Sequence, residues 1–280
     1  MNNFLPGLYI VSTPIGNLED ITLRAINVLK NSDKILCEDT RRSLKILNHY
    51  NIKKKLISYH KFNEKKVTPS ILELIKGGEK ISLISDAGTP LLSDPGLILL
   101  RECIKRKIKI FPIPGVSAIT TAISVSGFDE KYYFYGFLPK KIKEIDEIGK
   151  KLKNYNVNIV FFIPAVKINF YTKFFKKYFS GRKIFVGREM TKIHETFYRE
   201  NVNEFVGLNS GVKGELTVVL SKQYEKYNLA TDNFDEDKLK VEIRKYLKRY
   251  SLKDVVNLIS QKNKLPKKKV YNLCLKLKNL

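Results

Sequence analysis

The 280-residue sequence contains only three cysteines and no long apolar run. Cys37, Cys103 and Cys274 are scattered, so they show neither the spacing of a metal site nor a disulfide framework, and a reducing compartment is favoured. The apolar stretches fall short of the roughly 18 residues that a membrane helix needs. The first residues also lack the basic and apolar regions of a secretory signal. We therefore expect a cytoplasmic protein with no metal site and no membrane span.

Two phosphate-binding patterns are absent as well. Neither G-x-G-x-x-G nor G-x-x-x-x-G-K-[ST] occurs in the chain. The sequence thus gives no support to a dinucleotide site of the Rossmann type or to a nucleoside triphosphate site of the P-loop type.

Acidic residues are few relative to basic ones. The chain has 52 Lys and Arg against 28 Asp and Glu, a formal net charge of +24. Such a balance favours a polyanionic partner, either nucleic acid or an anionic membrane surface. Lysine greatly outnumbers arginine, however, and an AT-biased genome also places lysine at tolerant surface positions. Composition leaves both explanations open.

What is present is typical of a globular protein, with 43% apolar residues, 15 Gly and 10 Pro. In residues 1–126, short β-branched runs alternate with segments whose apolar residues have helical spacing. Helices between consecutive strands predict a largely parallel sheet that is covered on both faces. We expect its strands at residues 8–11, 35–37, 56–59, 81–85 and 108–113.

The rhythm changes at Gly127, where we place a domain boundary. In residues 127–224, the expected strands follow one another without helices of comparable length between them, which predicts a mixed sheet with antiparallel pairs. These strands are expected at residues 132–137, 157–163, 183–187, 195–198 and 216–220. The two parts together predict an α/β protein.

Residues 235–280 form a third, basic part. Residues 238–280 hold 14 basic and 2 acidic side chains, and their apolar residues have the spacing of three short helices. Ser251 with Asp254 is typical of a capping box, and Pro266 suits the start of a helix. Such a unit is either a helix-turn-helix that binds nucleic acid or a helical appendage that packs against the rest of the protein. Both interpretations stay open.

Three loops after expected strands combine Gly and Pro with small polar residues, at residues 12–17, 85–96 and 114–118. Ligands of open α/β sheets bind at the carboxyl ends of strands, and loops of this composition let a ligand approach the backbone closely. A single loop of this kind would be an ordinary turn. Three of them at strand ends of one sheet indicate a ligand site.

The segments LYIVSTPIGNLEDITLRA at residues 8–25 and SDAGTPLLSDPG at residues 85–96 closely resemble one family. That family is the ribosomal RNA small subunit methyltransferase I group of the tetrapyrrole (corrin/porphyrin) methylase superfamily. Shorter matches extend the resemblance from about residue 8 to residue 221, and they lie at residues 38–41, 60–64, 114–115, 136–139, 187–192, 194–196 and 213–215.

The resemblance implies two α/β domains of the tetrapyrrole methylase type, a class III methyltransferase, with a small C-terminal helical domain. It further implies a homodimer that transfers a methyl group from S-adenosylmethionine to the ribose 2′-oxygen of a cytidine in the decoding region of 16S rRNA. The chain departs from the family at residues 162–167, where Phe-Ile-Pro-Ala-Val-Lys replaces aromatic-Glu-Ser-Pro-His-Arg. It departs again at Phe62, where a histidine is common.

A cofactor site between the two α/β domains follows from the same resemblance. Carboxylates would meet the positive groups of S-adenosylmethionine, and backbone N–H groups at a helix start would meet its carboxylate or hydroxyls. Turn formation or helix capping is the alternative role for Asp86 and Asp94. The residues expected to bind the cofactor are Pro14, Asp86, Ala87, Gly88, Thr89, Leu92, Ser117, Ala118, Ile163, Gly187 and Gly214.

Methyl transfer to a hydroxyl needs in-line approach and a place for the hydroxyl proton, although orientation alone accounts for much of the rate. Histidine or a carboxylate can accept that proton. The catalytic candidates are His60, Glu64 and Glu38, with His60 on the RNA side of the cleft. Closing a turn is the alternative role for His60.

Basic side chains near these motifs suit phosphate, because guanidinium and ammonium groups position an RNA backbone without reading its sequence. We expect RNA contacts from Arg41, Arg42, Arg188 and Lys192. Solvated ion pairs with Glu38 or Glu189 are the alternative.

Two other functions stay open. The same cleft could methylate a small acceptor such as a tetrapyrrole, although the basic C-terminal part argues against it. The protein could also be a non-catalytic ribosome-binding factor, an alternative that the altered segment at residues 162–167 keeps open.

Overall fold

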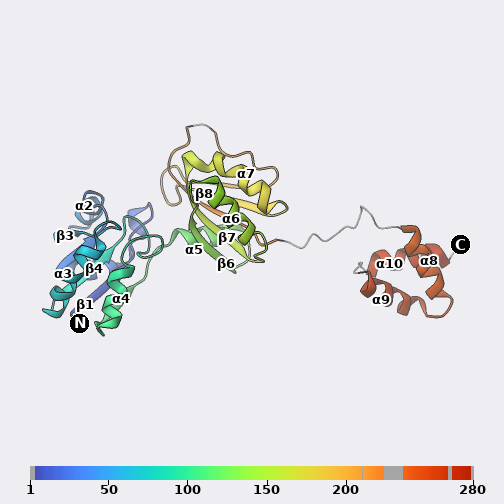
Figure 1. Cartoon of the computed structure of the whole chain (residues 1–280), viewed down its shortest axis with the longest axis horizontal. Coiled ribbons are helices and arrows are strands. Elements are labelled where there is room, and N and C mark those ends of the chain that lie inside the picture. Colours follow the sequence, from blue (N-terminus) through green and yellow to red (C-terminus); the bar gives the residue numbers. More distant parts are fainter. Residues whose placement is uncertain (1–3, 210, 224–235, 264–266, 279–280) are drawn as a thin grey trace. The chain divides into compact units, whose positions relative to one another are not determined.

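The computed structural model describes residues 4–209, 211–223, 236–263 and 267–278. The chain divides into two compact units, Met1–Tyr224 and Glu225–Leu280 (Figure 1). The division of the first unit into domains 1–126 and 127–224 stays a prediction, because contacts group both sheets into the one unit.

The first sheet is parallel throughout, with strand order β3-β2-β4-β1-β5. The strands lie close to the expected positions, which confirms the α/β prediction for this part. Their carboxyl ends therefore lie along one edge of the sheet. The bounds are β1 (Gly7–Val11), β2 (Lys34–Cys37), β3 (Lys55–Ser58), β4 (Lys80–Ile84) and β5 (Ile110–Ile113).

Helices cover both faces of this sheet because alternate strand residues point to opposite faces. Tyr9 packs with one hydrophobic cluster, which includes residues of α1 (Leu23–Asn31) and α2 (Thr40–His49). Leu8 packs with the other cluster, which includes residues of α3 (Glu64–Lys76) and α4 (Leu97–Lys105). A short 3₁₀ helix, η1 (Leu18–Asp20), follows β1.

The second sheet is mixed, with strand order β6-β7-β10-β8-β9. The pair β6 and β7 is parallel, whereas β10 runs antiparallel to both β7 and β8, and β9 is antiparallel to β8. The bounds are β6 (Tyr132–Phe137), β7 (Asn158–Pro164), β8 (Lys183–Arg188), β9 (Thr196–Asn201) and β10 (Glu215–Leu220).

The expectation that no helices of comparable length separate these strands is wrong. Helix α6 (Ile142–Leu152) lies between β6 and β7, and α7 (Ile168–Phe179) follows β7 after the 3₁₀ turn η2 (Ala165–Lys167). Lysines occupy much of the exposed surface of both helices, and the buried face of α7 is largely aromatic. Aromatic residues favour strands in sequence-based reasoning, which hides the helical spacing of α7.

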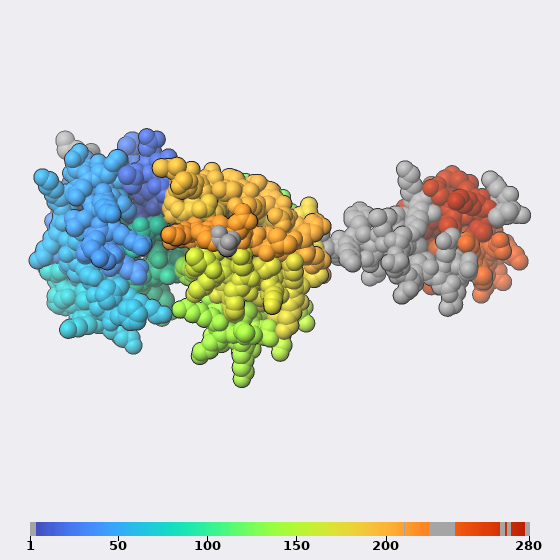
Figure 2. Space-filling model, turned by 90° about the horizontal axis from the view of Figure 1, so that it is seen from above, coloured from blue at the N-terminus to red at the C-terminus, as the bar shows by residue number. Residues whose placement is uncertain are grey.

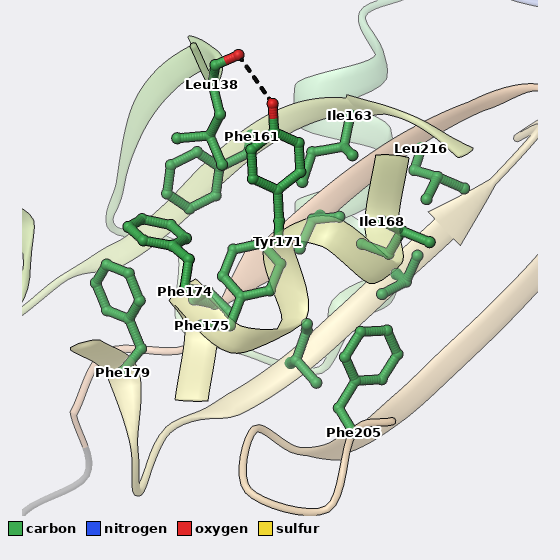
Figure 3. Packing of buried hydrophobic residues seen from close by; sticks show 14 of the residues in the cluster. Leu138, Phe161, Ile163, Ile168, Tyr171, Phe174, Phe175, Phe179, Phe205 and Leu216 are labelled. Carbon is green, nitrogen blue, oxygen red and sulfur yellow. Dashed lines mark hydrogen bonds between the residues drawn. The ribbon is translucent and has the colours of Figure 1, made fainter. Parts of the chain in front are cut away.

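The largest hydrophobic cluster lies between the second sheet and α7 (Figure 3). Phe161 of β7 packs against Phe175 of α7, with ring centroids 6.0 Å apart. The buried Tyr171 hydroxyl donates to the carbonyls of Leu138 at 3.2 Å and Pro139 at 3.0 Å, so its polar atom is satisfied inside an apolar core.

Helix α5 (Ala118–Ser126) joins the two sheets. It follows β5 in the chain, but its Ile119 and Ala122 pack in one cluster with Val160, Phe185 and Val219 of the second sheet. The start of α5 is thereby held between the carboxyl edge of the first sheet and one face of the second.

The second unit consists of three helices, α8 (Glu236–Leu247), α9 (Leu252–Lys262) and α10 (Lys267–Lys278), around an apolar core of their own. Ser251 caps α9 by accepting from the Asp254 N–H at 3.3 Å, and its hydroxyl lies 2.6 Å from the Asp254 carboxylate. Pro266 and the connector 224–235 lie outside the described residues. Within the described ranges, no helix has the length and apolar character to cross a membrane.

The buried Arg182 side chain connects several elements around the second sheet by hydrogen bonds. Its guanidinium donates to the carbonyls of Val157 at 3.2 Å, Ser221 at 3.1 Å, Lys153 at 3.1 Å and Tyr155 at 2.6 Å. It thus satisfies carbonyls from the end of α6, the approach to β7 and the end of β10.

Replacement of Arg182 by Met is expected to lower the free energy of unfolding by about 3 kcal/mol or more, because buried carbonyls lose their donors. Chemical denaturation followed by circular dichroism measures this loss. Arg106→Met serves as the control, since Arg106 makes only exposed ion pairs with Glu73 and Glu102, and we expect a change within about 0.5 kcal/mol. A loss at Arg182 no larger than at Arg106 would contradict the prediction.

Candidate functional site

A cavity of about 480 Å³, here called the first cavity, lies at the carboxyl edge of the first sheet and extends to the second sheet. Its walls come from the loops after β1, β2, β4 and β5 and from the ends of β6, β7, β8 and β10. The residues that line it are Ile15, Glu38, Arg42, Asp86, Ala87, Gly88, Thr89, Leu92, Ser93, Asp94, Ser117, Ala118, Ile119, Phe137, Phe162, Ile163, Pro164, Gly187, Glu189, Met190, Lys192, Glu215, Leu216 and Thr217.

Most residues that the sequence assigns to cofactor binding are brought together here. Pro14 and Gly214 are the exceptions among the expected set, but their neighbours Ile15 and Glu215 line the cavity. The expected residues in the lining are Asp86, Ala87, Gly88, Thr89, Leu92, Ser117, Ala118, Ile163 and Gly187. Their role in binding stays a prediction.

Buried hydrogen bonds fix the loop after β4 to its neighbours. Thr13 and Gly88 form a two-way backbone pair, with N–H to carbonyl distances of 2.9 and 3.0 Å. The Thr89 hydroxyl lies 3.1 Å from the Ser12 hydroxyl and donates to the Val116 carbonyl at 3.1 Å. The three Gly- and Pro-containing loops predicted to form a ligand site are therefore one connected structure.

Backbone strain is concentrated in the loops that border the cavity. Leu91 and Ser93 after β4 have φ values of 73° and 74°, and Glu189 and Thr191 after β8 have φ values of 48° and 65°. Non-glycine residues rarely adopt this left-handed region, and such strain persists only where the surroundings hold it. Ser93 and Glu189 both line the cavity, so the strained backbone is part of its wall.

The loop after β1 also touches the loop after β8. The Asn17 N–H donates to the Thr191 hydroxyl at 3.0 Å, and a Cβ on Gly16 would lie only 2.4 Å from Cγ of Lys192. In the space-filling view, blue N-terminal residues meet yellow-orange residues of the second half of this unit (Figure 2). The contact joins two loops whose residues Ile15 and Lys192 line the cavity.

Carboxylates outnumber cations in the lining. Glu38, Asp86, Asp94, Glu189 and Glu215 face only Arg42 and Lys192. Arg42 pairs with Asp86 at 3.2 Å, and Lys192 pairs with Glu189 at 2.9 Å and Glu215 at 3.5 Å. Glu38 has no ion pair or side-chain hydrogen bond within the described part of the chain. A cavity with this excess of negative charge suits a cationic ligand.

Two of these carboxyls have raised pKa values. Burial, followed by the charge of Glu38, raises the pKa of Asp94 to about 7, although a hydrogen bond from Ser85 opposes the shift. Burial and then the Asp86 charge raise the pKa of Glu38, while His60 and Arg42 act in the opposite direction. Perturbed carboxyls in a cleft are typical of functional sites.

The N-terminus of α5 contributes polar groups to the cavity. Ser117 is its N-cap residue, but the Ser117 side chain makes no capping hydrogen bond. The first N–H groups of the helix therefore have no side-chain partner at the cap, and helix N-termini favour anionic or hydroxyl ligands.

A second cavity of about 590 Å³ lies at the carboxyl ends of β2, β3 and β4. Glu38, Arg42 and Asp86 line both cavities and form a shared wall. The residues of the second cavity are Glu38, Asp39, Thr40, Arg41, Arg42, Ser58, His60, Phe62 and Asp86.

The three catalytic candidates do not all line the cavities. Glu38 lines both cavities, and His60 lines the second. His60 also closes a turn, because its Nδ1 accepts from the Phe62 N–H at 3.3 Å and its own N–H donates to Asn63 Oδ1 at 2.8 Å. Glu64 lines neither cavity, and its carboxylate accepts from the Gly96 N–H at 3.2 Å.

The four residues expected to contact RNA do not lie in one place either. Arg41 and Arg42 line the second cavity, where Arg41 pairs with Asp39 at 2.9 Å and lowers the pKa of that carboxyl to about 2. Lys192 lies in the first cavity and pairs with Glu189, which is the alternative that the sequence left open. Arg188 lines neither cavity and donates to the Lys213 carbonyl at 3.2 Å.

Sequence reasoning misses most of the second sheet's contribution. The carboxyl-end rule holds for parallel strands, whereas β10 enters the site with its first residues, because it is antiparallel to β7 and β8. The KGE motif at residues 213–215 indicates this edge of the sheet in the sequence, but it does not indicate the direction in which β10 runs. The cavity residues missed in this half are Phe137, Phe162, Pro164, Glu189, Met190, Glu215, Leu216 and Thr217.

Known proteins similar to this chain agree with the fold. Residues 7–206 match the family described as Tetrapyrrole (Corrin/Porphyrin) Methylases. A diphthine synthase structure has a TM-score of 0.61 at 13% identity, covering 76% of this chain and 89% of that one. The uroporphyrin-III-C-methyltransferase of Thermus thermophilus has a TM-score of 0.54 at 16% identity, covering 78% and 93%. These structures show the tetrapyrrole methylase fold.

Sequence relatives are much more similar. Ribosomal RNA small subunit methyltransferase I of Thermotoga maritima is 46% identical over 76% of this chain and 97% of its own length. The protein of the same name from Buchnera aphidicola is 37% identical over 99% of both chains. The chain belongs to the ribosomal RNA small subunit methyltransferase I family, within the tetrapyrrole methylases.

Proposed function

We propose that this protein transfers a methyl group from S-adenosylmethionine to the ribose 2′-oxygen of a cytidine in the decoding region of 16S rRNA. The observation that carries the proposal is the pair of adjoining cavities, one suited to a cationic cofactor and one open to a larger acceptor, which share the wall of Glu38, Arg42 and Asp86. The names of the relatives support the rRNA substrate. The cytoplasm, where ribosomal subunits are found, is the location that goes with this substrate.

The residues of the first cavity fit S-adenosylmethionine. Bound there, it would supply a methyl group on a positively charged sulfur, and the carboxylate excess in the lining complements its cationic groups. The uncapped start of α5 offers N–H groups to its carboxylate or hydroxyls. Phe162, Met190 and Leu216 give an apolar wall for the adenine ring.

The chain's own residues would act mainly by orientation and charge. The hydrogen bonds between Thr13, Gly88 and Thr89 hold the cavity wall before any ligand arrives, which reduces the cost of aligning the reactants. Glu38 lies on the wall between the cavities and is the group we propose to take the hydroxyl proton. Its raised pKa makes it a better proton acceptor than an ordinary carboxylate.

The basic C-terminal unit supports an RNA substrate. Its three helices enclose an apolar core, and the sequence of residues 238–280 carries 14 basic against 2 acidic side chains. We propose that this unit contacts rRNA phosphates, as do Arg188 and Lys192 of the first unit. Assembly into a homodimer is part of the same proposal.

Purified protein is expected to methylate small ribosomal subunits that lack the modification. The assay uses labelled S-adenosylmethionine followed by nucleoside mass spectrometry of the RNA, and the expected product is 2′-O-methylcytidine. Transfer to uroporphyrinogen but not to RNA would favour a tetrapyrrole acceptor. Failure to bind S-adenosylmethionine, measured by calorimetry, would favour a non-catalytic ribosome-binding factor.

Cofactor affinity is expected to rise between pH 5.5 and pH 7.5. The free protein holds Asp94 mostly protonated below its pKa of about 7, and a cationic ligand binds the ionised carboxylate better. Calorimetric titration with S-adenosylmethionine across this range measures the slope. Asp94→Asn is expected to flatten it, whereas Asp146→Asn, an exposed carboxyl whose pKa is lowered beside Lys177, is expected to leave it unchanged. An unchanged slope in Asp94→Asn would contradict the assignment.

Replacement of Glu38 by Gln is expected to lower kcat by about 100-fold, since a positioned proton acceptor contributes roughly 10²–10⁴-fold. The dissociation constant of S-adenosylmethionine should change much less. His60→Ala and Glu64→Gln test the other two candidates, and Glu73→Gln, an exposed residue paired with Lys76, is the control. Full activity in Glu38→Gln at saturating RNA, with a loss in His60→Ala, would move the role to His60.

A further inference from the structure

We propose that the second cavity receives the base of the acceptor nucleotide and that Phe62 is the platform on which this base stacks. The proposal rests on the proposed function, because it assigns one part of the RNA substrate to one side chain. It makes Phe62 a positioning residue rather than a catalytic one.

The turn that contains Phe62 exposes this residue to solvent. Phe62 is 94% exposed, although it lies in the lining of the second cavity. The turn between β3 and α3 is fixed, because the Phe62 N–H donates to His60 Nδ1 at 3.3 Å and the Asn63 side chain donates to the Ser58 carbonyl at 2.9 Å. Because the backbone that carries the ring is already fixed, a flat ligand that covers the ring has to order only the side-chain rotamer.

The charges around the ring favour a neutral ligand over a phosphate. Arg41 pairs with Asp39 at 2.9 Å and Arg42 pairs with Asp86 at 3.2 Å, so both guanidinium groups of this cavity already face carboxylates. A phosphate placed among Glu38, Asp39 and Asp86 would be repelled. A nucleobase is uncharged and flat, and unpaired RNA bases stack on exposed aromatic side chains.

The shared wall explains why this base belongs to the acceptor nucleotide. A ribose placed beside Glu38 would lie at the border of the two cavities, where its 2′-oxygen would face the first. The base is joined directly to that ribose, so the adjoining second cavity is the space available to it. The neighbouring His60 ring, which also lines the second cavity, lies edge-on to Phe62 with the ring centroids 6.1 Å apart.

Two variants test the ring directly in the full-length protein. Phe62→Ala is expected to raise the KM for unmodified small subunits about 5- to 20-fold, the lower part of the range seen when a stacking ring is removed. The kcat and the affinity for S-adenosylmethionine should stay close to wild type, and Phe62→Tyr should restore KM. Leu23→Ala, at an 86% exposed apolar residue that lines neither cavity, is the matched control.

A binding experiment separates base stacking from backbone contacts. We expect fluorescence anisotropy to show that wild-type protein prefers a labelled oligocytidylate over an abasic oligomer of the same length, and that Phe62→Ala loses this preference. An unchanged KM in Phe62→Ala, or the same preference for oligocytidylate in both proteins, would overturn the proposal. Weaker binding of Phe62→Ala to whole subunits but not to the oligomers would also overturn it, because Phe62 would then contact a ribosomal protein and not a base. If the wild type methylates no RNA, the proposed function fails, and the anisotropy preference still decides on Phe62.

Discussion

The backbone pair between Thr13 and Gly88 is the constraint on which the site depends. It ties the loop after β1 to the loop after β4, and the Thr89 hydroxyl extends the tie to the loop after β5. Because Gly88 has a φ of +77° and a Cβ there would lie 3.2 Å from Ile15, this position favours glycine. With three loops fixed to one another, the strained residues Leu91 and Ser93 keep a conformation that would relax in a free loop.

The second constraint is the direction of β10. Since it is antiparallel to β7 and β8, its first residues meet their last residues at the same edge of the sheet. Glu215 of β10 therefore lies near Glu189 after β8, where Lys192 pairs with both. Helix α5 packs against this sheet and begins at the carboxyl edge of the other. The first cavity thus depends on both sheets, and neither would form it alone.

The sequence predicts the first half of the site well and the second half poorly. The loops that hold Asp86 to Thr89 and Ser117 were found because parallel strands place their carboxyl ends along one edge, and the family resemblance then named the individual residues. Thr217 and Phe162 were not found, since strand direction depends on pairings between distant segments. The aromatic composition of α7 likewise conceals a helix whose stability comes from tertiary packing. Asp94, for which the sequence left turn formation or helix capping as the alternative role, owes its raised pKa to burial that no local pattern reveals.

The carboxylates of the cavity suggest how the fold tolerates so much negative charge in one place. Asp94 can stay protonated in the free protein, because its pKa of about 7 lies near neutrality. Asp86 has Arg42 as its partner, which leaves Glu38 as the carboxylate that faces both cavities and has no ion pair among the described residues. A positive charge entering the first cavity would stabilise the ionised forms of both Asp94 and Glu38. A cationic ligand in the first cavity would thereby favour the ionised form of Glu38, which also faces the second cavity. The protonation state of this proposed proton acceptor would then depend on whether the first cavity fills before the second.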